Sequence, residues 1–454
     1  MPDSLATNPP VVPPPPARVP RPGPPRVEPG RGGRARVGDG RVSVRAGRPA
    51  LPLLRALAVA GLCLFATTAV TGAQARQVAA TYPIGMLLPD SELVYGPAAY
   101  GWDTAAFVAE QGGYLARYNE IVDGEVLGGA QILQRVAEDY SVGPRLLLTL
   151  IEMHSGWVTQ SDPTETTFPA GGVLPGLAPG LAAAADGLSG YYYGHRFAGL
   201  RDIEEVGRVP EANAATFALL AWLGREAPEG QWAGLEMPSR FYAAWTRLFG
   251  DPLRFELDAV VPRAIAPARP QLPFGAGELW YYVAGPHSAW GASGPRAAVD
   301  FAPPPAQATG CLASIAWVRA VAPGTVLRAR DAGVVVDLED DGFEGTGWVH
   351  VYAHLSPVDR VAPGTRVQAG DPLGHPSCAG GLESQSRVTF ARRLNGEWIP
   401  ADDPEAPLSL GGWTALPGNL PGEGWLVTQG LPERRAAIEK LDAVNGIAAL
   451  PTSP

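Results

Sequence analysis

Apolar residues repeat at helical spacing through the first half of the chain, starting at residue 129. Ile132, Leu133 and Val136 fall on one side of a helix, and Pro144 takes a first-turn position in a second helix that is apolar nearly all round. Because a helix without a polar face is normally buried, the pattern predicts an all-α domain, which we place at residues 82–260. The segments with this spacing are 129 to about 150, broken at 141–144, then 212–222 and 239–248.

Beyond residue 274 the helical spacing gives way to the alternation that is typical of β-strands. Short Val-rich runs are separated by Pro-Gly or Asp-Gly turns, such as Pro323-Gly324. The pattern predicts a compact antiparallel β domain over residues 274–430, and therefore a multidomain α+β protein. A Pro/Ala linker at 261–273 precedes this domain, and a tail or short helix at 431–454 follows it. The predicted strands are 318–322, 324–330, 333–338, 347–355 and 387–390.

The first 75 residues differ from the rest. Residues 1–50 combine proline runs with scattered arginine, a composition that cannot bury enough apolar surface to fold, and we expect a disordered tail. Residues 51–75 are largely apolar and end in a small-x-small sequence, Ala73–Ala75, which is typical of a signal peptide; a signal-anchor helix through residues 51–73 also fits. Both interpretations predict that the chain after residue 76 is exported. A buried core helix is the alternative.

Charge and cysteine content narrow the possible functions. The net charge of -10 includes ten Arg before residue 56, so the remainder of the chain is strongly acidic. An acidic surface does not bind a phosphate backbone, and no nucleic-acid partner is expected. Cys63 lies in the apolar segment, which leaves Cys311 and Cys378 as the cysteines of the exported part. We expect these two to form a disulfide, with two buried free thiols as the alternative.

One predicted strand carries most of the candidate chemistry. In residues 348–355, apolar side chains alternate with Trp348, His350, Tyr352 and His354, which all fall on one face. An apolar row opposite a row of aromatic and imidazole side chains favours a core on one face and a binding surface on the other. We therefore predict that these four residues line a substrate groove.

Residues on both sides of this strand resemble a known family. His287 and Asp300, with the Asp-Phe pair that ends the motif, and the strand that ends at His354 are similar to the LasA subgroup of lysostaphin-type peptidases. These are zinc endopeptidases that cut peptide cross-links of bacterial cell walls. The resemblance covers roughly residues 275–430. It implies that His287 and Asp300 are metal ligands, that His354 assists catalysis, and that peptidoglycan or wall peptides are the partner.

The last motif departs from that family. Where the family has His-x-His, this sequence has Arg387 in place of a catalytic histidine and Thr389 in place of the third zinc ligand. A catalytic zinc site needs three protein ligands and an open position for water. Because Arg387 and Thr389 alternate with apolar residues, they are expected to point toward the same site, where a guanidinium would repel zinc.

Two other histidines are considered as the missing ligand. His350 lies four residues before His354, about 13 Å along a strand that rises ~3.3 Å per residue, so the two cannot hold one ion. His375 lies in a loop near Cys378 and would reach the site only if that loop folds inward. Zinc is therefore the expected cofactor if the protein is active, and none is expected otherwise.

The predicted helix after Pro144 has a second resemblance, to the catalytic helix of lysozyme-like lytic transglycosylases. The acid of that family directly precedes Ser-Gly, but here His154 takes this position and Glu152 lies two residues earlier, about 200° around the helix. Such enzymes need a carboxyl group in an apolar pocket that raises its pKa. Glu152 is thus a glycosidase candidate, and a buried paired carboxylate or a helix-end carboxylate is the alternative.

Taken together, these features favour an exported cell-wall protein, either secreted or anchored in the membrane. A lysozyme-like helical domain would precede a LasA-like β domain, with both active sites degenerate. Such a protein would bind peptidoglycan or regulate wall remodelling with little hydrolysis. An active zinc endopeptidase and a structural or protein-interaction module are the alternatives. Metal content would distinguish an active zinc endopeptidase from the other two possibilities. Binding to cell walls would distinguish a wall-binding protein from a purely structural or protein-interaction module.

Overall fold

The computed structural model describes most of the chain after residue 84. The predicted tail at 1–50 and the apolar segment at 51–75 lie outside the described residues. Within the part that is described, no helix is both long and apolar enough to cross a membrane. The described residues are 85–165, 175–203, 207–208, 211–226, 236–257, 260–261, 270–305, 311, 314–380, 385–437 and 441–449.

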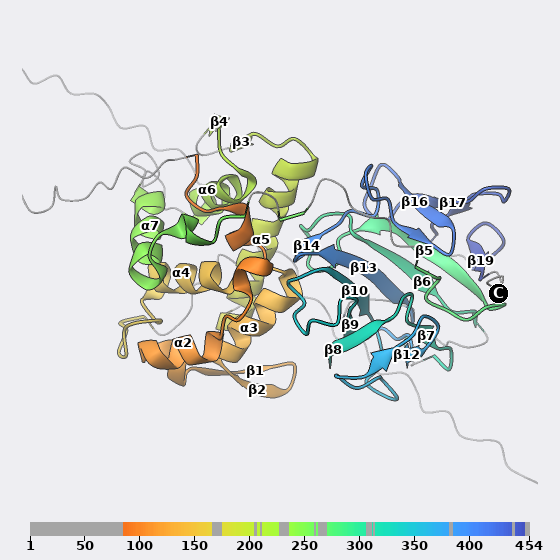
Figure 1. Cartoon of the computed structure of the whole chain (residues 1–454), viewed down its shortest axis with the longest axis horizontal. Coiled ribbons are helices and arrows are strands. Elements are labelled where there is room, and N and C mark those ends of the chain that lie inside the picture. The colour runs from red at the N-terminus through yellow and green to blue at the C-terminus, as the bar shows by residue number, and fades with distance from the viewer. Residues whose placement is uncertain are drawn as a thin grey trace, which may run out of the picture. The chain divides into compact units, whose positions relative to one another are not determined.

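The chain is mainly helical up to residue 255, as the spacing predicts (Figure 1). Pro144 begins α4, and Gly156 ends it in the left-handed conformation, with φ of 68°, that glycine adopts without strain. The helices are α1 (Asp90–Leu93), η1 (Pro97–Ala99), α2 (Thr104–Gln111), η2 (Tyr114–Arg117), α3 (Gly129–Tyr140), α4 (Pro144–Ser155), α5 (Leu177–Phe197), α6 (Ala214–Glu226), α7 (Glu236–Phe249) and η4 (Pro252–Phe255).

The prediction of an all-α domain is wrong in one respect, because this region also contains β-hairpins. Strands β1 (Asn119–Val122) and β2 (Glu125–Gly128) pair antiparallel, with Ile121 opposite Val126. Strands β3 (Asp202–Ile203) and β4 (Gly207–Arg208) form a shorter pair. The first hairpin turns at Asp123-Gly124, a sequence that favours a tight turn, but its strands are too short for a pattern of alternation to stand out.

The second half of the chain is built on a large antiparallel sheet, as predicted. Its order is β11-β8-β9-β10-β13-β6-β5-β19, with β14 paired to β13; β7 pairs with β12, and β15-β16-β17-β18 form a further sheet. The strands are β5 (Leu279–His287), β6 (Ala298–Ala302), β7 (Val318–Arg319), β8 (Gly324–Arg330), β9 (Gly333–Asp337), β10 (Trp348–Ala353), β11 (Arg366–Val367), β12 (Pro372–Gly374), β13 (Val388–Leu394), β14 (Glu397–Trp398), β15 (Ser409–Leu410), β16 (Trp413–Pro417), β17 (Gly424–Val427), β18 (Arg434–Arg435) and β19 (Gly446–Ala448).

The end of the chain is not only a tail. Within the segment 431–454, for which the sequence pattern predicts a tail or a helix, β18 pairs with β17 and β19 pairs with β5. Strands of two or three residues are too short to show a period of two. Their pairing depends on the neighbouring strand, so the local sequence does not reveal it.

Both faces of the large sheet are buried. On one face, Val349 and Val351 of β10 belong to the same hydrophobic core as the helices. On the other face, Tyr352 packs in a second core together with Trp413 and Leu426 of the smaller sheet. The central strands β10 and β13 are therefore covered from both sides, and the helical and β regions share one continuous core.

Charged residues also join α3 to the sheet. Arg328 of β8 donates a hydrogen bond of 2.7 Å to Asp139 of α3, and its Nε lies 3.1 Å from Glu344. Arg330 lies 3.1 Å from the same Asp139 carboxylate. Arg393 of β13, which is fully buried, pairs with Glu344. This network connects a helix of the first half of the chain to two strands of the second.

Candidate functional site

Asp300 is the centre of the site that the sequence predicts. It lies in the middle of β6 and is only 2% exposed. In the register of the sheet it stands directly opposite Thr389 of β13. His287, at the end of β5, reaches it from the other neighbouring strand, where two irregularities in the β5–β6 register shift the end of β5.

Both oxygens of the Asp300 carboxylate are engaged by side chains of the neighbouring segments. Thr389 donates from Oγ1 to Oδ1 at 2.6 Å, and the Nε2 atom of His287 lies 3.2 Å from the same oxygen. Arg387 donates from its guanidinium to Oδ2 at 2.9 Å. The structure therefore brings His287, Asp300, Arg387 and Thr389 together, as a hydrogen-bonded cluster around one buried carboxylate.

The electrostatics of this cluster match an ion pair. Burial opposes the charged form of His287, but the Asp300 carboxylate outweighs it and raises the pKa of His287 to about 9. Burial likewise opposes ionisation of Asp300, yet His287 and Arg387, with the Thr389 hydroxyl, hold its pKa well below the usual range. Nδ1 of His287 lies 2.9 Å from the carbonyl oxygen of Gly285, so a protonated ring donates from both nitrogens.

These residues do not fit a zinc ion. His287 and Asp300 are the two side chains of the cluster with the chemistry of zinc ligands, one fewer than the three that a catalytic zinc site needs. The Arg387 guanidinium is a permanent cation on the oxygen that would otherwise be available. Within the described ranges, no three His, Cys, Asp or Glu side chains are grouped so that they could hold a metal.

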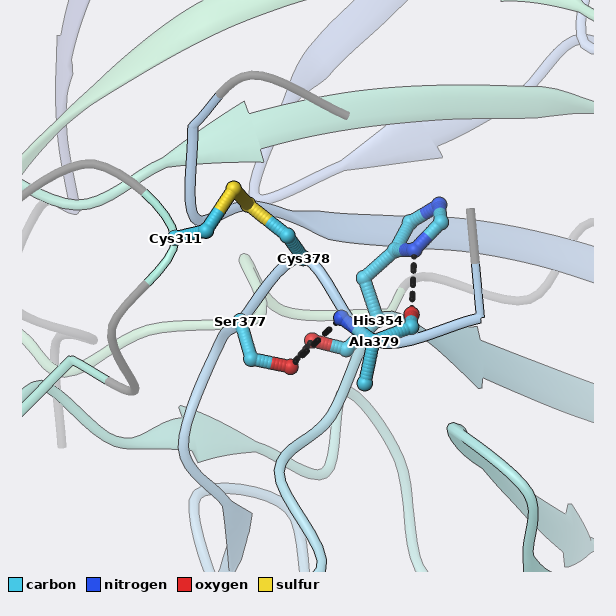
Figure 2. Close-up of a disulfide and its surroundings, with 5 residues drawn as sticks. All are labelled: Cys311, His354, Ser377, Cys378 and Ala379. Atoms are coloured by element: carbon cyan, nitrogen blue, oxygen red, sulfur yellow. Dashed lines mark hydrogen bonds between the residues drawn. A yellow bond between two sulfur atoms is a disulfide. The ribbon is translucent and has the colours of Figure 1, made fainter. Parts of the chain in front are cut away.

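His354 is held beside this cluster by the disulfide loop. It follows β10 with φ of 63°, and its Nδ1 lies 2.8 Å from the carbonyl oxygen of Ala379 (Figure 2). The backbone N–H of Ser377 donates to the carbonyl of His354 at 2.7 Å. Cys378, between these two partners, is bonded to Cys311, which confirms the predicted disulfide.

The same loop connects His354 to the ion pair. Ser377 forms a β-bridge with Arg387, whose N–H donates to the Ser377 carbonyl at 3.2 Å. Arg387 immediately precedes β13 in the sequence. Its backbone pairs with the loop that holds His354, and its side chain binds Asp300. The two parts of the predicted site are neighbours through backbone hydrogen bonds.

A cavity of about 590 Å³ opens beside His354. Its lining combines charged side chains with small apolar residues, and it comes from both halves of the chain: Asp331, Arg360 and Ala379 from the β region, and Asp123 and Arg135 from the helical region. Arg135 lies 3.4 Å from Asp331 across the cavity wall. The sequence does not reveal these residues, because they lie in turns and on one face of a helix. They come together where α3 contacts the β8–β9 turn, and nothing in the sequence of either segment predicts that contact.

The prediction of a groove along β10 is wrong for His350 and Tyr352, whereas His354 does line a cavity. His350 is 2% exposed, its ring meets Phe390 edge-on, and burial, followed by the nearby Arg392, lowers its pKa to about 3. Tyr352 is fully buried and its hydroxyl accepts from the N–H of Val321 at 2.8 Å. Trp348 is partly buried under Arg392. The alternation separates the two faces of the strand correctly, but the second core covers the face that was expected to bind substrate.

His375 and Glu152, the remaining candidates, are engaged elsewhere. The Nδ1 atom of His375 lies 2.7 Å from the carbonyl of Ala316, and its ring centroid is 3.9 Å from that of Trp317. Glu152 accepts hydrogen bonds from Thr159 and pairs with Arg247. The carboxylate of Glu152 is therefore buried and paired, which is one of the alternatives to a glycosidase role that the sequence leaves open.

Comparison with known proteins matches both halves of the chain in order. Residues 86–261 match the family model of the LasA N-terminal domain, and residues 300–400 match that of peptidase family M23. In both halves, and in the same order, the chain is therefore similar to the LasA-like, lysostaphin-type group of peptidase family M23. Protease LasA from two strains of Pseudomonas aeruginosa is 26% identical over 340 residues, which is 70% of this chain and 75% of the relative.

Solved structures of M23 peptidases are also similar to parts of the chain. The deep-sea M23 metalloprotease pseudoalterin is 22% identical, with a TM-score of 0.30, and the match covers 38% of this chain and 96% of that one. The catalytic domain of lysostaphin from Staphylococcus simulans is 22% identical, with a TM-score of 0.20, over 27% of this chain and 87% of that one.

Proposed function

We propose that this chain, which is similar to the LasA-like M23 group, is an exported protein that binds peptides of the bacterial cell wall without hydrolysing them. The observation that carries the proposal is the state of Asp300, whose carboxylate is bound by Arg387, Thr389 and His287. In this arrangement the residues at the family's metal positions stabilise each other and leave no set of three ligands. Export rests on the Arg-rich and apolar segments before residue 76.

The cavity beside His354 supports binding rather than a purely structural role. It is large enough for several peptide units, and its wall offers both acidic side chains and the guanidinium groups of Arg135 and Arg360. A peptide presents amide donors, carbonyl acceptors and, at its ends, charges of both signs. A polar cavity with both kinds of partner is therefore suited to it.

The helical region would act in this function as a wall of the cavity rather than as a glycosidase. A general acid needs a carboxyl oxygen that is open to the glycosidic oxygen, but one oxygen of Glu152 contacts Arg247 and the Thr159 hydroxyl, and the other accepts from the backbone N–H of Val158. The likeness of this region to lysozymes therefore remains a hypothesis about ancestry and not about activity.

The first experiment measures zinc and cleavage together. Purified protein should hold well under one zinc per chain and should not cleave wall peptides. The double variant Arg387→His, Thr389→His should bind about one zinc per chain, because the two substitutions supply a third ligand and remove the competing cation. Metal analysis of both proteins after dialysis against zinc is the measurement. Stoichiometric zinc and chelator-sensitive cleavage by the unmodified chain would show that it is an active endopeptidase.

The second experiment tests the cavity. In a sedimentation assay, His354→Ala should weaken binding to purified cell walls, because the substitution removes the imidazole from the cavity wall. His195→Ala is the control and should leave binding unchanged, since His195 lies in α5 and packs against Phe217. Equal binding by both variants would place the wall contact elsewhere. An unmodified protein that does not sediment with walls would instead be a structural or protein-interaction module.

A further inference from the structure

A second cavity lies where the end of α5 meets β14, and it shares no lining residue with the one beside His354. Its volume is about 490 Å³. One part of its lining is apolar, formed by Phe197, Ile399 and the prolines at 400 and 404. The other part is acidic. The cavity therefore combines an apolar wall with charged groups, which is typical of sites for small amphipathic ligands.

Glu397 lies at the buried end of this cavity. Its side chain is fully buried, and its Oε1 accepts from the hydroxyl of Tyr192 at 2.6 Å and from Arg196 at 2.9 Å. Its Oε2 is buried and has no hydrogen-bond partner in the described part of the chain. Burial raises the pKa of Glu397, and Arg196 only partly offsets this. A buried acceptor without a donor is costly and rare in folded proteins, so its position at a cavity indicates a ligand that donates.

The remaining charges around the cavity are predominantly negative. Asp402 and Asp403 are half-buried in the lining, and Glu405 is exposed at the rim. The Oδ1 atom of Asp403 accepts two backbone N–H bonds, from Glu405 and Ala406, which hold this carboxylate in place. The cation of the lining, Arg196, also lies 3.8 Å from Asp90. Carboxylates thus outnumber guanidinium groups, and the field favours a cation.

We propose that this cavity binds a primary alkylammonium group, with the ammonium donating to Oε2 of Glu397 and the alkyl chain lying against Phe197 and Ile399. An ammonium group has three donors and no acceptor, which matches a site whose open groups are carboxylate oxygens. The lysine-type side chain of a peptide and a free diamine both carry this group. The inference goes beyond wall binding at His354 and does not depend on it, because the two cavities are lined by different residues.

The test is calorimetric titration of the full chain with hexylammonium chloride and, separately, with 1-hexanol. Hexylammonium should saturate a single site, and the alcohol, which has the same chain and no charge, should bind roughly tenfold more weakly or not at all. Glu397→Gln should weaken hexylammonium binding by roughly tenfold, since it places an amide donor where Oε2 accepts. Glu433→Gln, which removes the same charge from an exposed position, should leave binding unchanged.

Two further ligands distinguish the sources of the ammonium group. Tighter binding of an acetylated, amidated lysine than of 1,6-diaminohexane would indicate a peptide side chain, and the reverse order would indicate a free diamine. If Glu397→Gln does not fold, Asp402→Asn keeps the buried contacts of Glu397 and should still weaken binding several-fold. Equal binding of hexanol, absence of hexylammonium binding, or unchanged affinity in both variants would overturn the proposal. His354→Ala should not affect it, so the two proposals fail independently.

Discussion

At the scale of single residues, Asp300 shows how neighbours change the role of a carboxylate. The sequence resemblance predicts a metal ligand at Asp300, but three donors from β5, β13 and the residue before β13 surround its side chain. The sequence indicates that Arg387 and Thr389 point toward this position, because alternation along a strand fixes the side-chain directions. It does not reveal that His287 is more basic than usual, since this depends on burial and on the distance to Asp300.

The first prediction concerns the pH dependence of stability. His287 titrates near 6.5 in an unfolded chain and at about 9 in the folded protein, so its stabilising effect is complete below pH 6.5 and is lost as the pH rises through 9. The free energy of unfolding should therefore fall by roughly 2 to 3 kcal/mol across that window, at about 1.4 kcal/mol per pKa unit.

Urea unfolding at intervals between these pH values measures the effect. His287→Asn should remove most of the slope, because it cannot gain a proton. His195→Asn serves as the control, since burial lowers the pKa of His195 and moves its titration below this window. An unchanged slope in His287→Asn would mean that the ion pair with Asp300 does not form.

At the scale of elements, the helix α5 shows where prediction from sequence is limited. Residues 177–197 contain four glycines, which have poor helix propensity and obscure the apolar pattern. In the structure, a Cβ atom at Gly187 would lie 2.4 Å from the Trp222 ring of α6. The glycine therefore allows two helices to approach closely, and this reason becomes visible only when the partner helix is in place. The helices α3, α4, α6 and α7 have few interruptions and are predicted from their spacing alone.

The second prediction tests this close approach. Gly187→Ala should destabilise the protein by about 1 to 2 kcal/mol, because an overpacking cost of up to about 3 kcal/mol against Trp222 exceeds the gain of about 1 kcal/mol in helix propensity. Gly194→Ala lies in the same helix and meets only the flexible end of Leu200, at 3.3 Å, so it should be neutral or stabilising. Denaturant midpoints of both variants give the comparison; equal effects would show that helix propensity, not packing, sets the outcome.

Strand β10 shows the same limit for the site. Its alternation correctly divides Val349 and Val351 from His350 and Tyr352, but both sets are buried. Which face of a strand meets solvent depends on what packs over it, and here the smaller sheet near the end of the chain does so. Several residues that line the cavity at His354 come from turns and from α3, and the sequence pattern does not show that these segments meet.

At the scale of the whole molecule, we expect the helical and β regions to unfold as one cooperative unit. They share a hydrophobic core that includes Val335 of β9 and Trp398 of β14. The ion network of Arg328 and Arg393 with Asp139 and Glu344 adds buried polar contacts across the same boundary. A buried charge left without its partner is strongly destabilising, so the network resists separation of the two regions.

The third prediction follows from this coupling. Asp139→Asn should lower stability by about 3 kcal/mol, since it leaves Arg328 partly uncompensated in a buried position. Far-ultraviolet circular dichroism, which follows the helices, and tryptophan fluorescence should shift by the same amount. Glu125→Gln breaks an exposed pair with Arg135 and should cost less than about 1 kcal/mol. Separate transitions for the two probes would contradict the shared core.

The disulfide has a consequence for how the chain withstands proteases. Cys311 and Cys378 are 67 residues apart, and the ring of chain that they close contains β8, β9 and β10. A single cut anywhere inside that ring yields two fragments that stay covalently joined, and the antiparallel ladders from β8 to β13 continue to hold them in register. Such a nicked molecule migrates as an intact chain until it is reduced. The loop at His354 is thus secured by a bond that survives the loss of a peptide bond.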